Sequence, residues 1–207
     1  MRSRTTQRIK KAAAAGIAAA ALALPAGAQA GPLVADAPDC ASQALSQPFL
    51  PWADVAQYTL AGGGSFEPGN GKPWSLNGAS ITSGNEPYFV TSGSDKRVLS
   101  LPDGSSATSR SVCASLNRPS IRFFASSSNP SAVLNVEVLF EDALGNVNSA
   151  PIGAVTGNSG WAPSAPMPIV ANLLPLLSGN NTAVAFRFTA SGGSFQIDDV
   201  YVDPMFR

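Results

Sequence analysis

The 207-residue chain contains no histidine, and this absence removes several classes of function at once. Ser-His-Asp and Cys-His catalysis both need an imidazole base, and the common catalytic zinc sites use histidine ligands. Charged residues make up only 13% of the chain, and no run of Lys or Arg is longer than two. A basic face, which a nucleic-acid partner requires, is therefore not indicated.

A long hydrophobic run is missing as well. The longest, residues 12–24, has 13 residues, fewer than the roughly 20 that a membrane-spanning helix needs. Five basic residues precede this run, and Ala28-Gln29-Ala30 follows it as a small-x-small motif. This arrangement is typical of a secretory signal peptide, so we predict that residues 1–30 are removed. The alternative is an N-terminal anchor that is retained.

Removal of this segment changes the charge of the protein. Five of the 13 basic residues and none of the 13 acidic residues lie in it, which leaves a net charge of −5. We therefore predict a secreted protein with an acidic balance, no nucleic-acid partner and no membrane span after removal of the signal peptide.

Cysteine is scarce, since Cys40 and Cys113 are the only two. In an exported protein, two such cysteines are expected to pair. The bond would close a loop of about 74 residues and stabilise the fold by about 4 kcal/mol on a chain-entropy estimate. The alternative, a pair of reduced thiols as catalyst or metal ligands, lacks a CxxC spacing or a nearby histidine.

Residues 31–207 suit one domain in length. Gly, Ser, Pro, Asn and Thr recur between short apolar runs, and no long segment has a 3.6-residue period. This pattern predicts an all-β sandwich or barrel. We expect a proline-broken N-terminal arm over residues 31–57, pinned by the disulfide, and a β-sandwich domain over residues 58–207.

The strongest strand pattern covers residues 132–141, where apolar residues alternate with Asn135, Glu137 and Glu141 on the opposite face. Residues 147–155 should return as its hairpin partner. Residues 183–189 and 194–202 should form the last two strands. Shorter strands are expected at 52–60, 80–82, 88–91, 97–101, 111–116 and 121–125, a loop at 105–111 and a helical turn at 171–174.

The last expected strand places two adjacent carboxylates, Asp198 and Asp199, between apolar residues. A carboxylate so close to a core is costly unless it is paired, hydrogen-bonded or bound to a metal. Replacing Asp198 by alanine should therefore destabilise the protein more than replacing Glu141, which the alternation places on the solvent face.

Both ends of the sandwich region carry short motifs, namely Gly64-Ser65-Phe66-Glu67-Pro68-Gly69, Trp74-Ser75-Leu76, Gly78-Ala79-Ser80 and Ile197-Asp198-Asp199-Val200. These motifs resemble those of carbohydrate-binding modules with a galactose-binding-like jelly roll. The resemblance spans roughly residues 58–204 and implies a jelly-roll β-sandwich. The whole chain also resembles uncharacterised secreted bacterial proteins of this type, a likeness that implies no function. The signal peptide predicts an extracellular or cell-surface location.

In that family, the first and last strands run close together and often hold a structural calcium. The resemblance therefore implies Glu67, Asp198 and, less directly, Asp199 as calcium ligands. Calcium takes six to eight oxygen ligands, so backbone carbonyls would complete the site. The alternative is that these carboxylates cap turns or accept backbone N–H bonds without a metal.

A glycan site needs exposed aromatic rings, and six Trp and Tyr residues are available. The family resemblance implies that Trp74 and Trp161 are buried. Trp52 and Tyr88 flank Pro- and Gly-rich loops, which makes them the better candidates for glycan binding. The family's sugar contacts vary between members, so no motif assigns them.

Catalysis by a pair of carboxylates remains open in principle, since glycoside cleavage needs two acids that face each other. The candidate acids are Glu86, Glu137, Glu141 and Asp142. We interpret them as solvent-facing or turn residues and predict a non-catalytic module that binds a glycan or cell-wall polysaccharide. The alternative is a structural or protein-interaction domain at the cell surface with no sugar ligand.

Overall fold

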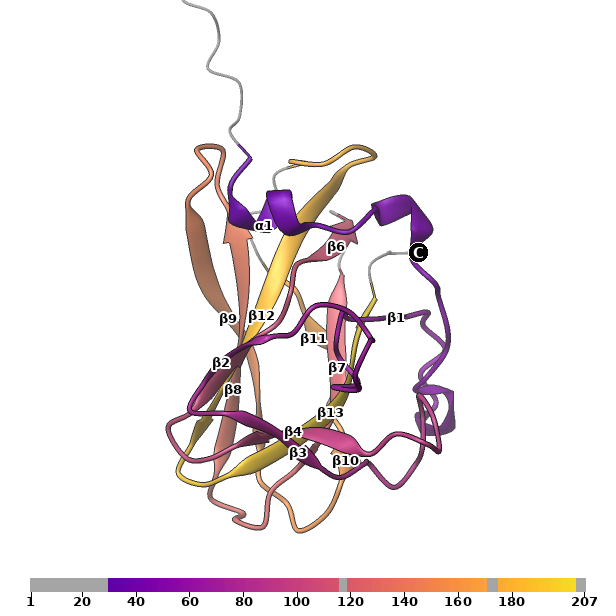
Figure 1. Cartoon of the computed structure of the whole chain (residues 1–207), viewed down its shortest axis with the longest axis vertical. Coiled ribbons are helices and arrows are strands. Elements are labelled where there is room, and N and C mark those ends of the chain that lie inside the picture. Colours follow the sequence, from indigo (N-terminus) through magenta and orange to yellow (C-terminus); the bar gives the residue numbers. More distant parts are fainter. Residues whose placement is uncertain (1–29, 116–118, 171–174, 204–207) are drawn as a thin grey trace, which may run out of the picture.

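The computed structural model describes residues 30–115, 119–170 and 175–203, which form two facing antiparallel sheets (Figure 1). The predicted signal peptide, apart from Ala30, and the predicted helical turn at 171–174 lie outside the described residues. In the part of the chain that is described, no helix is long and apolar enough to cross a membrane.

The first sheet has seven strands, and its main order is β10-β7-β13-β4-β3. Strand β1 pairs with β13, and β11 pairs with β7. The bounds are β1 Thr59–Leu60, β3 Ser80–Ser83, β4 Arg97–Leu101, β7 Ser120–Ser126, β10 Ala162–Pro163, β11 Met167–Pro168 and β13 Phe195–Asp203.

The second sheet has six strands in the main order β2-β5-β12-β8-β9, with β6 also on β12. The bounds are β2 Ser75–Asn77, β5 Ser106–Thr108, β6 Val112–Ser115, β8 Val133–Glu141, β9 Val147–Thr156 and β12 Asn181–Ser191. The chain crosses repeatedly between the sheets, for example from β4 to β5, from β6 to β7 and from β12 to β13. Two antiparallel sheets linked in this way form a jelly-roll β-sandwich, as predicted.

The sandwich core lies between the two sheets and follows from the alternation along the strands. Leu134, Val136 and Val138 of β8 are fully buried, and so are Phe186 and Phe188 of β12. They pack against the inward side chains of β4, β7 and β13 in one continuous apolar cluster. The period-two pattern of the sequence predicted these inward faces.

The later part of the N-terminal arm covers the outer face of the first sheet and gives it a second, smaller core, whereas its residues 32–36 lie against β8 and β12 of the second sheet. The arm contains α1 (Pro32–Asp36) and two 3-10 turns, Cys40–Ser42 and Leu50–Trp52. Phe49 and Tyr58 pack on Phe124 of β7 and Tyr201 of β13, and all four are at most 5% exposed. β7 and β13 are therefore buried on both faces.

Several local expectations were wrong. Residues 52–58 form the end of a 3-10 turn and irregular chain, apart from a single bridge between Tyr58 and Ser46, and strand β1 covers only Thr59–Leu60. Residues 88–91 form a loop, because buried carboxylates bind its backbone N–H groups. Residues 106–108, expected as a serine-rich loop, form β5, where Ala107 points into the core.

Candidate functional site

Strand β13 breaks its regular register at the two aspartates. The pairing with β7 shifts between Asp198 and Tyr201, and Asp199 has a left-handed backbone with φ of 48°. Adjacent residues of a regular strand point to opposite faces, and this irregularity allows both carboxylates to be buried. Asp198 is 1% exposed and Asp199 is 2% exposed. The predicted burial at this strand is confirmed.

The backbone of the loop 85–91 lies against these carboxylates. Asp198 Oδ2 accepts a bond from the Glu86 backbone N–H at 3.2 Å, and Asp199 Oδ2 accepts one from the Thr91 N–H at 3.1 Å. Glu86, itself fully buried, accepts from the N–H of Val90 at 2.6 Å and from that of Tyr88. The three carboxylates therefore fix the loop that carries Tyr88.

These three carboxyl groups have no matching cation. Among the described residues, no ion pair includes Glu86, Asp198 or Asp199. Burial, together with the charge of Asp199, raises the pKa of Asp198 to about 8 despite its two backbone hydrogen bonds. Burial also raises the pKa of Asp199 to about 6, against the bonds from Thr91.

In a metal-free buffer, we expect the free energy of unfolding to fall as the pH rises from about 5 to about 8. Both carboxyls titrate near 3.8 in the unfolded chain, so the folded chain holds more protons in this interval. A rise in pH therefore favours unfolding. The fall should be at least about 1.4 kcal/mol, the equivalent of one pKa unit.

Urea unfolding in EDTA at several pH values in this range measures that dependence. Asp198→Asn should flatten it, because the amide does not titrate. Asp142→Asn, at an acceptor in the β8–β9 turn, should leave the slope unchanged. Equal stability of the unaltered protein at pH 5 and pH 8 would contradict the account of a buried, uncompensated acidic cluster.

Glu67, the other carboxylate implied as a calcium ligand, lies at the edge of this acidic region. It accepts a bond from the Lys96 N–H at 2.6 Å, and its charge helps to raise the pKa of the neighbouring Asp95 after the effect of burial. Within the described residues, no three acidic or sulfur ligands lie close enough together to hold a metal ion. The calcium site therefore stays a prediction.

The two aromatic residues singled out for glycan binding lie side by side. The rings of Trp52 and Tyr88 meet edge to face with centroids 4.9 Å apart, although they come from different loops. Tyr88 is 43% exposed and Trp52 is half-buried. The Tyr88 hydroxyl donates to the Trp161 carbonyl at 2.8 Å, which fixes the ring. Phe89, next to Tyr88, is 56% exposed.

Trp52 also lines an open groove of about 550 Å³ beside the arm. Its polar wall includes Asp54, Ser120 and Arg122. An aromatic ring next to converging polar groups is the composition expected of a small-molecule or sugar subsite. We call the Trp52–Tyr88 pair the aromatic face, and the groove lies at its edge.

The remaining Trp and Tyr residues are buried or half-buried. Trp74 is 5% exposed and stacks on Phe188 in the sandwich core, as the family resemblance implies. Tyr58 and Tyr201 are buried under the arm. Trp161 is half-buried against the second core, so the expectation of a buried core residue holds for it only in part.

Each acid considered for catalysis makes structural contacts. Glu137 bonds Arg187 at 2.7 Å, and Asp142 accepts N–H bonds within the β8–β9 turn. Glu86 belongs to the buried cluster. The expected exposure of Glu141 is wrong, because this side chain is 1% exposed and binds the backbone of residues 31–34. Glu141→Ala is therefore not a surface control for Asp198→Ala.

Arg122 is an important residue that the sequence reading missed. It is 6% exposed on β7, donates to Asp54 at 2.6 Å and to the Ser164 carbonyl at 2.9 Å, and lies 4.2 Å above the Phe49 ring. Asp54 also accepts from the Tyr58 hydroxyl at 2.7 Å. The available signal was a lone arginine at an outward position within an apolar strand.

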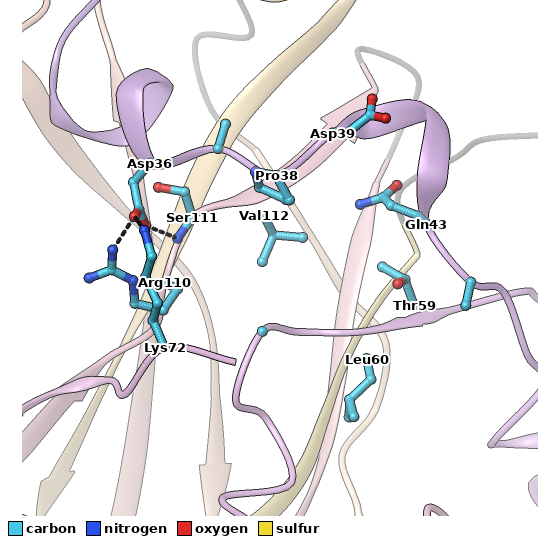
Figure 2. A pocket seen from close by; sticks show the side chains of 13 residues that line it. Asp36, Pro38, Asp39, Gln43, Thr59, Leu60, Lys72, Arg110, Ser111 and Val112 are labelled. Atoms are coloured by element: carbon cyan, nitrogen blue, oxygen red, sulfur yellow. Dashed lines mark hydrogen bonds and ion pairs between the residues drawn. The ribbon is translucent and has the colours of Figure 1, made fainter. Parts of the chain in front are cut away.

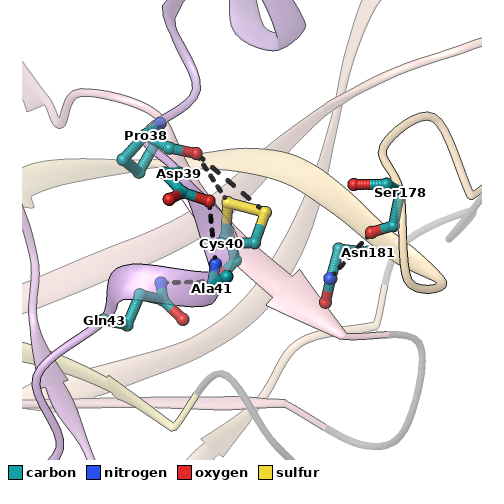
Figure 3. The surroundings of a disulfide bond; sticks show 8 residues. Pro38, Asp39, Cys40, Ala41, Gln43, Ser178 and Asn181 are labelled. Atoms are coloured by element: carbon teal, nitrogen blue, oxygen red, sulfur yellow. Dashed lines mark hydrogen bonds between the residues drawn. A yellow bond between two sulfur atoms is a disulfide. The ribbon is translucent and has the colours of Figure 1, made fainter.

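A disulfide bond joins Cys40 and Cys113 and ties the arm to β6 (Figure 3). Beside it, a cleft of about 460 Å³ lies between the arm and residues 59–62 and 110–112. Figure 2 shows Asp36 at one end of this cleft, bonded to Lys72, Arg110 and the Ser111 backbone. These contacts fix the arm at a second position.

No protein-family model and no curated protein sequence matches the chain. Solved structures that are similar to it include the xylanase 10B module pair CBM22-1–GH10 of Clostridium thermocellum, with 13% identity and a TM-score of 0.46. The match covers 72% of this chain and 27% of that one.

Two isolated binding modules are also similar. The CBM22-1 xylan-binding domain of Paenibacillus barcinonensis Xyn10C has 14% identity over 67% of this chain and 89% of that one, with a TM-score of 0.46. TmCBM61, solved with β-1,4-galactotriose, has 17% identity over 70% and 95% of the two chains, with a TM-score of 0.40. These structures belong to the class that the sequence motifs resemble, while the function of this chain rests on its own residues.

Proposed function

We propose that this protein is a secreted, non-catalytic module whose aromatic face binds a polysaccharide. The observation that carries this proposal is the pairing of Trp52 with the exposed Tyr88 beside a groove with a polar wall. Flat rings offer apolar area to the C–H face of a sugar at little cost in side-chain entropy. Polar groups next to them satisfy the sugar hydroxyls.

The buried carboxylates contribute to this function through the backbone. Glu86 fixes the N–H of Tyr88, and Asp199 fixes the N–H of Thr91 at the other end of the loop. The Thr91 hydroxyl also bonds the Tyr201 hydroxyl at 2.7 Å. A loop held at several points loses little conformational freedom on binding, which favours affinity.

Retention of the protein without its signal peptide on a panel of insoluble polysaccharides and bacterial cell walls tests the proposal. Trp52→Ala and Tyr88→Ala should each weaken retention about tenfold or more, the equivalent of about 1.4 kcal/mol. Leu144→Ala, at a 76%-exposed apolar residue in the β8–β9 turn, is the matched control and should bind normally.

An outcome with no retention on any polysaccharide would contradict glycan binding. A specific observation then favours a protein partner, because Leu50, Val55 and Phe89 are each more than half exposed. Exposed apolar groups are typical of interaction surfaces when they form a contiguous patch.

Secretion is supported by two independent features. The chain carries the predicted signal sequence, and its disulfide requires an oxidising compartment for stable formation. Mass measurement of the protein recovered from the medium or cell surface tests this part of the proposal.

For the acidic cluster, we propose a structural cation such as calcium. What supports it is the charge of Asp198, Asp199 and the nearby Glu67, together with Asp95 Oδ2, which is buried with no hydrogen-bond partner among the described residues. Carboxylate oxygens are the ligands that calcium prefers.

We expect millimolar calcium to raise the melting temperature by several degrees relative to EDTA at pH 8. The increase should be larger than at pH 5, where the aspartates hold protons and compete with the ion. Asp199→Asn should reduce the calcium effect, whereas Asp142→Asn should not. Equal melting temperatures in calcium and EDTA at pH 8 would remove calcium from the account.

A further inference from the structure

Glu141 is a buried carboxylate that binds the first residues of the arm. Its Oε2 accepts from the Gly31 N–H at 3.0 Å, and its Oε1 accepts from the N–H groups of Leu33 and Val34. In the described part of the chain, no ion pair includes Glu141. A negative charge that is 1% exposed therefore faces only neutral donors.

Gly31 also follows directly after the predicted cleavage motif Ala28-Gln29-Ala30. We propose that cleavage between Ala30 and Gly31 creates a structural ion pair between the new α-ammonium group and Glu141. A signal peptidase supplies the reaction with water: the peptide bond breaks, the hydroxyl goes to the Ala30 carbonyl, and Gly31 N leaves as an amine that takes up a proton. Maturation thus delivers the cation that Glu141 lacks.

The packing around Gly31 supports this role. A Cβ atom there would lie 2.4 Å from the Gly145 carbonyl oxygen and 2.8 Å from the Glu141 carboxyl carbon. The turn backbone at Gly145 and the Glu141 side chain therefore approach residue 31 as closely as a glycine permits. The mature chain would begin with the residue type that this position requires.

The position of the new amine is also fixed from the other side. Asp36, at the end of α1, bonds Lys72 at 3.0 Å, Arg110 and the Ser111 backbone (Figure 2). The short stretch between Gly31 and Asp36 is thus held at both ends, so the amine stays beside Glu141. A buried hydrogen bond from an ammonium group to a carboxylate is stronger than the hydrogen bond from the neutral amide N–H that it replaces.

Three forms of the same chain test the proposal: one that begins at Gly31 with a free amine, one acetylated on that amine, and one that keeps Ala30 before it. The acetyl group keeps an amide at Gly31 and removes the charge. The free-amine form should melt several degrees above the other two at pH 6.5. Equal melting temperatures for the three forms would overturn the proposal, and this comparison needs no substitution.

Glu141→Gln adds a second readout. It should lower the melting temperature of the free-amine form more than that of the acetylated form, because only the former loses an ion pair. Glu137→Gln, on the same strand, should lower both equally. Equal effects of Glu141→Gln on both forms would also overturn the proposal, as would an exported protein whose mass shows a first residue other than Gly31.

Discussion

Replacement of Arg122 by alanine is expected to destabilise the protein by about 3–5 kcal/mol, the usual cost of breaking a buried ion pair by removing one partner. Asp54 would then keep its charge in a largely buried place without its cation. The change also removes the bond to the Ser164 carbonyl and the guanidinium over Phe49. Because this residue joins the arm to the first sheet, the arm should loosen with it.

Thermal or urea unfolding measures the effect, which should lower the melting temperature by roughly 10 °C for a domain of this size. Arg187→Ala is the matched control, because Arg187 pairs with Glu137 at 2.7 Å but is about one-third exposed. Exposed ion pairs contribute about 1 kcal/mol or less to the free energy of unfolding. Similar losses of stability for the two variants would contradict the conclusion that Arg122 is a main contact between the arm and the first sheet.

The second large effect concerns the disulfide. Replacing both Cys40 and Cys113 by serine should cost about 4 kcal/mol, because the 73-residue separation of the two cysteines lets the reduced unfolded chain regain much freedom. Chemical unfolding of the double variant and of the unaltered protein, each with and without reductant, measures this cost. Reductant should affect only the unaltered protein.

A loss below about 1 kcal/mol in the double variant would show that the other anchors of the arm suffice. Those anchors include the Asp36 contacts, the bonds from residues 31–34 to Glu141, the Arg122–Asp54 pair and the packing of Phe49. In that outcome the arm would remain folded without the covalent bond, and Arg122→Ala would become the more severe change.

The strands were predictable where one face is apolar and the other polar. The β8–β9 hairpin, β12 and β13 follow from alternation and from turn residues such as Asp142 and Gly145, because a one-residue slip would turn the core side chains outward. β5 was missed because serine and threonine flank its one core residue, Ala107.

The site was only partly predictable, because its key contacts join segments far apart in sequence. The pattern marked Asp198 and Asp199 as buried but gave no sign that they bind the backbone of residues 86 and 91. Trp52 and Tyr88 were chosen separately, from their loop surroundings. Their contact depends on the arm folding over the first sheet, which no local pattern encodes.

The burial of Glu141 was likewise not predictable from the local sequence pattern. Strand alternation alone places it on the solvent face of β8, and that position is indeed on the opposite side from Val138. The arm then covers this end of the strand and buries the carboxylate. Periodicity reports which face a residue occupies, whereas burial depends on what packs against that face.

Fluorine NMR of protein labelled with 5-fluorotryptophan would show whether the aromatic face binds a polysaccharide. The chain has three tryptophans, and Trp→Phe variants assign their resonances. Addition of a soluble oligosaccharide from a retained polysaccharide should shift the Trp52 resonance. Trp74, buried in the sandwich core, should not respond. An unchanged Trp52 resonance at saturating oligosaccharide would show that the sugar does not bind at the aromatic face.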